Sequence, residues 1–279
     1  MQVIPLGSGS GGNCYFFESD GTRVLVDAGF GPRETAKRLA AAAGCSIGQI
    51  DAIVITHEHS DHVHGADRIS RRFGIPLWLT RGTLEASRID PTEARVCVFE
   101  NNSEFRVGEI SVRARRTIHD AADPACFVLE ARDGTRVGIA SDLGYVDPPV
   151  LAHLSNCDAL LFEANHDLDM LRTGTYPWSL KRRILSNHGH LSNDDSLAAV
   201  RRMLGPDTRA LCMIHLSEKN NHASIVAGMA EALLDSLGAA IQLRIAAQRR
   251  PGDPIEIARR PGRPARPAPP PNPAQMPLF

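Results

Sequence analysis

A cluster of metal-ligand side chains follows a short apolar segment near the middle of the N-terminal half. Residues 53–56 are apolar or β-branched, which indicates a buried strand. The strand leads into a His-x-His-x-Asp-His segment that contains His57, His59, Asp61 and His62. Imidazoles and carboxylates suit divalent cations such as Zn²⁺ or Mn²⁺. Four ligands within six residues exceed what one tetrahedral ion takes from one loop, so we expect two ions sharing it. The alternative is a histidine-rich polar turn.

Further residues whose side chains could bind metal or transfer a proton also stand where predicted strands end. They are Asp27, Asp142, Glu163 and His215. Two polar loops add histidines, with His119 in residues 117–124 and His190 in residues 186–193. Active sites commonly gather on loops at the ends of strands, because a rigid sheet holds such loops in place. We therefore expect these residues to lie close to the segment from His57 to His62, which we call the His57 loop.

The elements that must position these residues are strands interrupted by a few helices. Strands are predicted over residues 3–6, 14–18, 23–27, 75–79, 126–130, 136–140, 159–162, 210–214 and 241–245, with several short ones in 95–114. Helices are predicted over 32–43, 66–73 and 222–237, and another ends at Leu204 with Asn193 or Asp194 as its cap. Because the order has no regular βαβ repeat, it indicates two packed sheets with helices outside.

A glycine-rich segment, Gly-Ser-Gly-Ser-Gly-Gly-Asn over residues 7–13, joins the first two predicted strands. Such a segment can bind phosphate, but here no Gly-Lys-Ser/Thr follows it. We therefore favour a tight backbone turn beside the active site.

Composition limits the class of protein. The 279 residues allow one large or two small domains, and 43% hydrophobic residues provide a sizeable core. A net charge of −1 argues against a strongly basic protein that coats nucleic acid. The six cysteines form no Cys-x-x-Cys pair and mostly lie in apolar segments, so we expect reduced core residues in a cytoplasmic protein. Without a signal-like N-terminus or a long apolar run, no membrane association is expected.

The composition changes near Gln248. Ten of the 19 prolines fall in residues 249–279, which carry six arginines against two acidic residues. This predicts a catalytic domain over 1–248 with a net charge of −5, and a disordered Pro/Arg-rich tail over 249–279 with a net charge of +4.

The ordered set of motifs resembles the metallo-β-lactamase superfamily over residues 1 to about 245. The resemblance rests on Asp27, the His57 loop, His119, Asp142 and His215. Further segments resemble its YycJ (WalJ)-like branch of DNA exonucleases, namely residues 7–14, 119–124, 163–167, 188–192 and 215–221. The resemblance implies an α/β fold of the αββα type, in which two β-sheets lie face to face between layers of helices.

The resemblance also implies two divalent ions, Zn²⁺ or Mn²⁺, and assigns their ligands. One ion is assigned to His57, His59 and His119, and the other to Asp61, His62 and His215. Asp142 would bridge them, and Asp27 would orient a ligand imidazole or the loop; a turn-forming role for Asp27 is equally open.

Other roles follow from the same resemblance. Asp61, Glu163 and His190 form the candidate catalytic group, with His190 held by Glu163 as a proton donor to the leaving oxygen. Glu163 alternatively ties down a loop. Ser217 and Asn221 are candidate phosphate contacts.

Three functions compete on these grounds. A metal-dependent DNA nuclease is favoured over a small-molecule hydrolase of the same fold, such as a phosphodiesterase, lactamase or thioesterase. A non-catalytic binding module is weakest, because every expected ligand position is filled. The 73 residues from Asp142 to His215 leave no room for the inserted β-CASP domain, so a long RNA is disfavoured. Short basic runs at 71–72, 113–116 and 181–183 favour DNA only weakly.

The last five residues, Gln-Met-Pro-Leu-Phe, resemble the peptide with which replication and repair proteins bind the bacterial sliding clamp. Gln275 would make polar contacts, and Leu278 and Phe279 would fill an apolar pocket. The alternative is an accidental match in a low-complexity tail.

Overall fold

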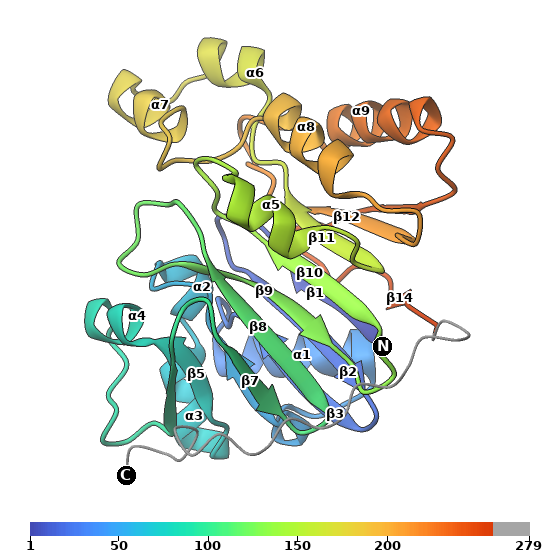
Figure 1. Cartoon of the computed structure of the whole chain (residues 1–279). Helices are drawn as coiled ribbons and strands as arrows, with labels where there is room; N and C mark the ends of the chain where they lie inside the picture. Colours follow the sequence, from blue (N-terminus) through green and yellow to red (C-terminus); the bar gives the residue numbers. More distant parts are fainter. Residues whose placement is uncertain (259–279) are drawn as a thin grey trace.

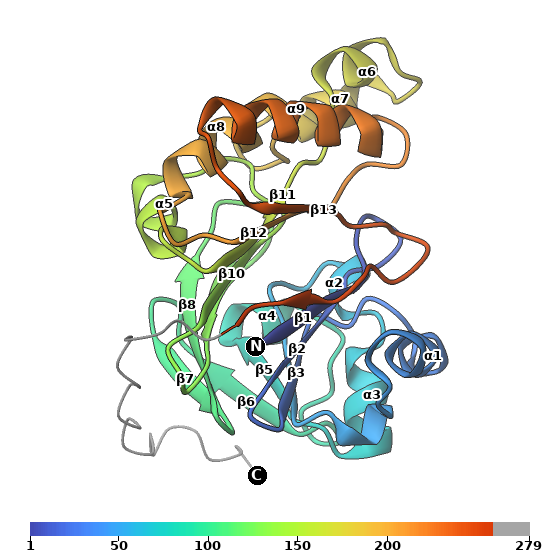
Figure 2. The same ribbon diagram turned by 90° about the vertical axis from the view of Figure 1, so that its right-hand side faces the viewer.

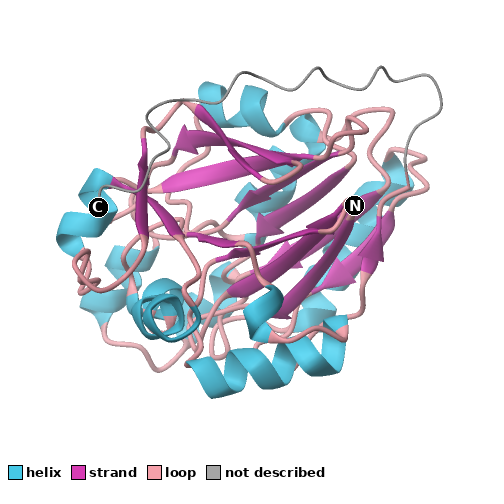
Figure 3. Ribbon diagram, turned by 90° about the horizontal axis from the view of Figure 1, so that it is seen from below, coloured by secondary structure: helices cyan, strands magenta, loops and turns pink. Residues whose placement is uncertain are grey.

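Two β-sheets lie face to face between outer layers of helices. The structure is a computed structural model that describes residues 1–258. Figure 1 shows α5, α8 and α9 over one sheet, and Figure 2, turned by 90°, shows α1 and α3 covering the outer face of the other. Seen from below, the strands form the centre and helices surround them (Figure 3). This arrangement confirms the predicted αββα sandwich.

Each sheet has seven strands within the described residues. The first runs in the order β14 (Ile255–Glu256), β1 (Gln2–Gly7), β2 (Cys14–Ser19), β3 (Thr22–Val26), β4 (Ala52–Val54), β5 (Leu77–Thr80), β6 (Val96–Phe99). The second runs in the order β13 (Gln242–Ile245), β12 (Ala210–Ile214), β11 (Ala159–Glu163), β10 (Arg136–Ala140), β9 (Ala125–Glu130), β8 (Ile110–Arg116), β7 (Glu104–Val107). Strands β3 to β6 are parallel, and so are β10 to β13.

The apolar strand sequences arise because both faces of each sheet are buried. On β2, Tyr15 and Phe17 point into the core between the sheets, whereas Phe16 points under the helices. On β9, Phe127 lies between the sheets and Val128 lies under the helices of the second sheet. Alternate side chains leave a strand on opposite faces, so a strand with two buried faces is apolar throughout.

Aromatic side chains from both sheets join them in the central core. Trp78 stacks on Phe105 with ring centroids 4.6 Å apart, and Phe99 stacks on Phe105 at 4.8 Å. Trp78 and Phe99 belong to the first sheet and Phe105 to the second. Aromatic pairs in such contact stabilise a core by about 0.5–1.5 kcal/mol beyond the area they bury.

The structure contains all four predicted helices and several short ones besides. They are α1 (Pro32–Ala43), α2 (Ser60–Val63), α3 (Ala66–Phe73), α4 (Arg81–Ala86), α5 (Pro148–Leu154), α6 (Leu168–Thr173), α7 (Trp178–Ile184), α8 (Asn193–Met203) and α9 (Ala223–Ser236), with a 3-10 turn over Ile47–Gln49. The short α2, α4, α5, α6 and α7 were not predicted. The cap of α8 is Ser192, whose Oγ accepts from the Asp195 N–H, so the prediction of Asn193 or Asp194 is wrong. Helices α6 and α7 extend beyond α8 (Figure 1).

The folded part of the chain continues past the predicted boundary at residue 248. Strand β14 pairs antiparallel with β1, with Val3 opposite Ile255, and the buried Ile255 and Ile257 join the central core. The correction has a simple reason: alternating Ile-Glu-Ile forms a strand within a segment whose prolines indicate an irregular tail. Residues 259–279 lie outside the described residues, and so does the predicted clamp-binding peptide.

Two expectations from composition concern cysteines and membranes. All six cysteines lie among the described residues, where they are buried and form no disulfide. Among residues 1–258, no helix combines the length and apolar character that crossing a bilayer requires.

Candidate metal centre

The candidate site lies where the carboxyl ends of parallel strands in both sheets meet. Strands β10, β11 and β12 are adjacent and parallel, so Asp142, Glu163 and His215 lie at one edge of the second sheet. In the first sheet β3 and β4 are parallel, which puts Asp27 beside the start of the His57 loop. The topology therefore gathers residues that lie far apart in the sequence.

Three of these strand-end residues have left-handed backbone conformations. Asp27, Asp142 and His215 have φ angles of 61°, 57° and 56°. Such conformations are uncommon for residues other than glycine, and they concentrate at functional sites that the surrounding structure holds in place. Two of the three, Asp142 and His215, are candidate ligands themselves, and Asp27 contacts the candidate ligand His62.

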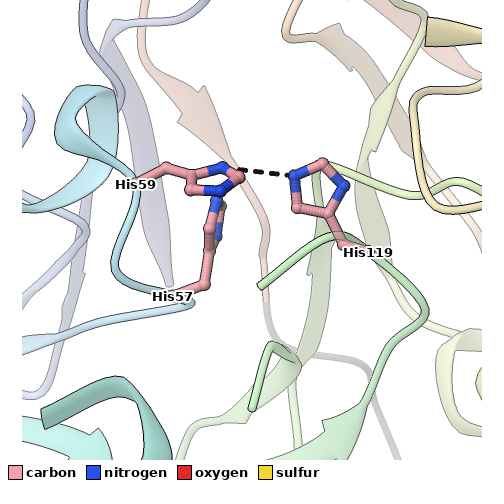
Figure 4. Close-up of side chains that lie close together, drawn as sticks. All are labelled: His57, His59 and His119. Atoms are coloured by element: carbon pink, nitrogen blue, oxygen red, sulfur yellow. Dashed lines mark hydrogen bonds between the residues drawn. The ribbon is translucent and has the colours of Figure 1, made fainter. Parts of the chain in front are cut away.

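The first ligand cluster consists of His57, His59 and His119, whose imidazoles face one another (Figure 4). One ligand atom from each lies within 4.8 Å of the others, and His59 Nδ1 is 3.3 Å from His119 Nε2. His57 Nε2 is buried without a hydrogen-bond partner. Burial lowers the pKa of His57, and the nearby His62 adds to the effect. Burial likewise lowers the pKa of His119. Both are therefore neutral at pH 7, which is the form that binds metal.

The second cluster consists of Asp61, His62 and His215. Asp61 Oδ2 lies 3.4 Å from His62 Nε2 and 3.4 Å from His215 Nε2. Although burial opposes the charged carboxylate, His62 and His215 hold the pKa of Asp61 below its usual value. Conversely, burial opposes a charged His215, but Asp142 and Asp61 raise its pKa to about 10. The carboxylates thus favour positive charge at this position, which a divalent cation supplies while leaving the imidazole neutral.

Asp142 lies between the two clusters. Its Oδ2 is 3.1 Å from His62 Nε2, and its Oδ1 is 3.8 Å from His119 Nε2 and 3.5 Å from His215 Nε2. The Asp142 side chain is 4% exposed, and Oδ2 has no hydrogen-bond partner. Unpartnered buried polar atoms on His57 and Asp142 are costly unless a cation binds them, so this donor set fits divalent metal.

Asp27 is buried beside the His57 loop and holds the His62 ring in place. Its Oδ2 accepts from His62 Nδ1 at 2.7 Å, and its Oδ1 accepts from the backbone N–H and Oγ1 of Thr56 at 2.8 and 3.0 Å. Thr56 Oγ1 is also 3.0 Å from His57 Nδ1. A carboxylate hydrogen-bonded to one ring nitrogen fixes the other nitrogen towards a metal, which is the orienting arrangement proposed for Asp27. Thr56 was not recognised from the sequence.

The glycine-rich loop over residues 7–13 contacts both the His57 loop and His215. Asn13 Nδ2 lies 3.1 Å from Asp61 Oδ2 and 3.1 Å from His62 Nε2, and the backbone N–H of Asn13 donates to the Asp61 carbonyl. Ser8 Oγ accepts from the His215 N–H at 2.7 Å. The turn depends on glycine, because Gly9 and Gly12 have φ angles of 132° and 145°. Asn13 and Ser8 are thus functional candidates that sequence reasoning missed, although their loop was singled out.

Glu163 and His190 form a hydrogen-bonded pair beside Asp142. His190 Nδ1 donates to Glu163 Oε1 at 2.8 Å, and it lies 3.6 Å from Asp142 Oδ1. Glu163 Oε2 accepts from the Leu143 N–H at 2.7 Å, and Oε1 lies 3.4 Å from His215 Nδ1. The fully buried Glu163 therefore contacts both His190 and the loop after β10, so it does tie down that loop, and its pairing with His190 as a proton donor stays a prediction.

The candidate phosphate contacts differ from each other. Asn221 is 6% exposed, and its amide pairs reciprocally with Asn193 and donates to the Ala164 carbonyl. Its hydrogen-bonding groups are therefore used within the fold. Ser217 is half-buried and its Oγ accepts from the Asn220 N–H.

Most basic side chains of the short basic runs are also occupied within the fold. Arg71 pairs with Asp67 and Glu93, and the buried Lys181 donates to the carbonyls of Arg172 and Gly174. Arg183 donates to Asp120 Oδ2 at 2.6 Å, and Asp120 Oδ1 lies 3.2 Å from His119 Nε2. Asp120 and Arg183 thus belong to the surroundings of the first cluster, and the sequence signal for Asp120 was its place next to His119.

Comparison with known proteins agrees with this geometry. Residues 22–216 match the family described as the β-lactamase superfamily domain. The chain therefore belongs to the metallo-β-lactamase superfamily, whose fold together with the His/Asp clusters fits a metal-dependent hydrolase.

Two relatives place the chain within a branch of that superfamily. It is 35% identical to the exodeoxyribonuclease WalJ of Streptococcus pneumoniae, over 86% of this chain and 91% of the relative. It is 32% identical to the exodeoxyribonuclease YycJ of Bacillus anthracis, over 85% of this chain and 90% of the relative. The chain is a member of this YycJ-like branch.

Solved structures confirm the fold alone. The metallo-β-lactamase fold protein YhfI of Bacillus subtilis has a TM-score of 0.68 at 16% identity, covering 91% of this chain and 99% of its own. The short form of human tRNase Z has a TM-score of 0.61 at 17% identity, covering 92% and 100%.

Proposed function

We propose that this chain is a two-metal phosphodiesterase that removes nucleotides from the ends of DNA. The observation that carries the proposal is the Glu163–His190 pair beside Asp142, where the two ligand clusters meet. A carboxylate between two ligand sets can contact both ions of a metal pair, and the leaving oxygen of a phosphodiester is stabilised when it receives a proton. The relatives named exodeoxyribonucleases support DNA as the polymer, because the similarity covers most of each chain.

The donors divide between two ions, Zn²⁺ or Mn²⁺. His57, His59 and His119 would hold one, Asp61, His62 and His215 the other, and Asp142 both. Bound there, the ions would lower the pKa of a water molecule and stabilise negative charge on the phosphoryl oxygens. Asp27 would keep His62 in the tautomer whose Nε2 faces the site.

His190 would hold and deliver a proton. Because its Nδ1 is engaged by Glu163, a substrate meets the ring through Nε2. Although burial opposes the charge on Glu163, His190 and His215 lower the pKa of its carboxyl, so an ionised carboxylate holds the His190 ring through Nδ1. The side chain is 14% exposed, so a substrate at the site has access to it.

An assay of purified protein tests this proposal. With Mn²⁺ or Zn²⁺ present, end-labelled single- and double-stranded DNA, RNA and a small phosphodiester would be compared. We expect DNA to be shortened from its ends, and Asp142→Ala to abolish hydrolysis with metal falling to one ion per chain or fewer. Good hydrolysis of the small phosphodiester with every polynucleotide intact would instead favour the small-molecule hydrolase.

We further propose that the segment Gln275–Met–Pro–Leu–Phe279 binds the bacterial sliding clamp. The support is its sequence, since Gln275, Leu278 and Phe279 lie outside the described residues. Tethering to a ring on DNA raises the local DNA concentration for a domain whose net charge is −5. Binding of the peptide to purified clamp would be compared with a Gln275→Ala, Leu278→Ala, Phe279→Ala peptide. Equal, negligible binding by both would refute the interaction.

A further inference from the structure

A pocket of about 330 Å³ adjoins the metal centre and is not needed by the reaction described above. It lies between the loop after β10, the segment leading into α8, and one side of α8 itself; we call it the α8 pocket. His190 lines this pocket, and its Nδ1 lies 3.6 Å from Oδ1 of Asp142 in the metal centre. A ligand in the α8 pocket is therefore next to the proposed proton donor. Its volume is at the small end of the range for ligand sites, which suits one small group and no long stretch of polymer.

The mouth of the α8 pocket exposes apolar surface that the fold does not bury. Tyr145 is 51% exposed and Leu185 is 40% exposed, and both line the pocket. They are two of the four large apolar side chains that stand exposed in residues 1–258. An exposed aromatic side chain such as Tyr145 can stack on a nucleobase, because every base presents a π face, and Leu185 adds apolar surface beside it.

The pocket also contains a polar side chain without a partner. His166 lines it, is 1% exposed, and has no hydrogen-bond partner on either ring nitrogen. Burial lowers the pKa of His166 to about 4, so at neutral pH the ring offers one donor and one acceptor. Buried polar groups are nearly always paired, so these two nitrogens call for a ligand with both kinds of group. The edge of a nucleobase has both.

We propose that the α8 pocket receives the base of one unstacked nucleotide at a DNA end, stacked on Tyr145 and read by His166. This inference rests on the proposed function and specifies which part of the DNA the site selects. Because His190 lines the pocket, the held base belongs to a nucleotide adjoining the phosphate that is cut. Moving a base out of a duplex costs a few kcal/mol and is easiest where pairing is already lost, so the pocket favours ends over the interior of a strand.

The test compares two DNA substrates that differ in the terminal nucleotide, which is either normal or abasic. The measured quantity is the ratio of kcat/KM for the normal end to that for the abasic end. We expect the wild-type ratio to be about 5 to 150, which is the effect that stacking of one base on an aromatic side chain has on binding. It should fall towards one in Tyr145→Ala and in Ala198→Phe, which fills the pocket from an exposed position on α8. It should persist in Tyr145→Phe and in Ala40→Phe, a control at an exposed alanine on α1.

A binding experiment separates the pocket from the reaction. Calorimetry would measure the binding of deoxynucleoside 5′- and 3′-monophosphates, beside deoxyribose 5-phosphate, which lacks a base. We expect tighter binding of the monophosphates by wild type, and His166→Phe and Ala198→Phe to lose that difference. DNA hydrolysis with a wild-type ratio near one, or an equal fall on both ends in Tyr145→Ala, would overturn the inference and leave the nuclease intact. Absence of DNA hydrolysis together with base-dependent binding would overturn only the proposed reaction.

Discussion

Four of the five histidines of the metal centre present the same ring nitrogen to the site. In four of them Nδ1 contacts a protein group, which leaves Nε2 directed at the other ligands. The four contacts are His57 with Thr56, His62 with Asp27, His119 with the Gly189 carbonyl, and His215 with Glu163. His59 is reversed, because its Nε2 contacts the Asp120 carbonyl and its Nδ1 faces His119. Such contacts fix the tautomer and the ring orientation before metal binds.

Asp27→Asn tests this preorganisation. The asparagine retains an oxygen for the Thr56 N–H, but its amide cannot accept from His62 Nδ1 as the carboxylate does. Loss of an orienting partner typically lowers metal affinity about 10- to 100-fold. Competition with a chelator would measure the change. Asp20→Asn, at a hairpin turn with a φ of 49°, is the control and should retain wild-type affinity. Unchanged affinity in Asp27→Asn would assign Asp27 to the turn alone.

His190→Ala should slow turnover by about 10²- to 10⁴-fold, the usual contribution of a general acid. Metal content should stay constant, because we assign the two ions to the His57 and Asp61 clusters and to Asp142, whereas His190 Nδ1 is hydrogen-bonded to Glu163. Substrates with good leaving groups need less protonation, so they should be slowed least. Equal slowing of all substrates would instead indicate that His190 acts through structure.

At the scale of elements, the parallel strands β10, β11 and β12 place Asp142, Glu163 and His215 side by side at one edge of the second sheet. The first sheet is completed by β14, which lies close to the end of the described residues. β14 comes from a segment that composition assigns to a tail, yet it supplies Ile255 and Ile257 to the core. Burying an isoleucine side chain stabilises a fold by about 1.5–3 kcal/mol.

A chain ending at residue 248 should therefore be less stable than a chain ending at 258. We expect a loss of several kcal/mol, because two buried isoleucines and the pairing with β1 are removed. Urea unfolding of both truncated chains in the metal-loaded state would measure the difference. Equal midpoints would show that β14 does not contribute to stability.

His153 on α5 should make the stability of the fold depend on pH. Burial lowers its pKa to about 4, and its Nε2 lies 3.1 Å from the Arg113 carbonyl. The unfolded chain binds a proton near pH 6.5 whereas the folded chain does not, so this contribution to stability is present above pH 6.5 and is lost as pH falls towards 4. In His153→Gln the fall in melting temperature from pH 7 to pH 5 should be smaller than in wild type. An identical fall would exclude His153 as a cause.

At the scale of the whole molecule, charge is distributed unevenly along the chain. The net charge of −1 includes four arginines in residues 259–279, so residues 1–258 carry −5. Nucleic-acid affinity comes largely from phosphate contacts, which a negative domain provides poorly.

DNA affinity should thus fall steeply with salt, and a chain ending at residue 258 should bind more weakly with a shallower dependence. Removing four arginines lowers the slope of log affinity against log salt by up to about 4. Titrations from 50 to 200 mM salt with both chains would provide the slopes. Identical slopes would show that those arginines do not contact DNA.

The sequence by itself determined the superfamily, the αββα fold, and the side chains of the two ligand clusters. Metal chemistry restricts ligands to a few residue types, and sheet topology restricts them to strand ends, so Asp142 and His215 could be identified 73 residues apart. The resemblance to the superfamily also led us to Asp27 and to the pairing of Glu163 with His190, and the structure places each carboxylate within hydrogen-bond distance of an imidazole.

Only the tertiary structure decided the roles of residues whose types have many uses. Asn13 reaches Asp61 across 48 positions, and Ser8 accepts from the backbone of His215 across 207. Nothing local in the sequence distinguishes such a serine or asparagine from one in an ordinary turn, because its function depends on a partner that folding brings near. The α8 pocket has the same origin: Tyr145 and His166 belong to different segments, and only the packing of α8 against the loop after β10 encloses a space between them.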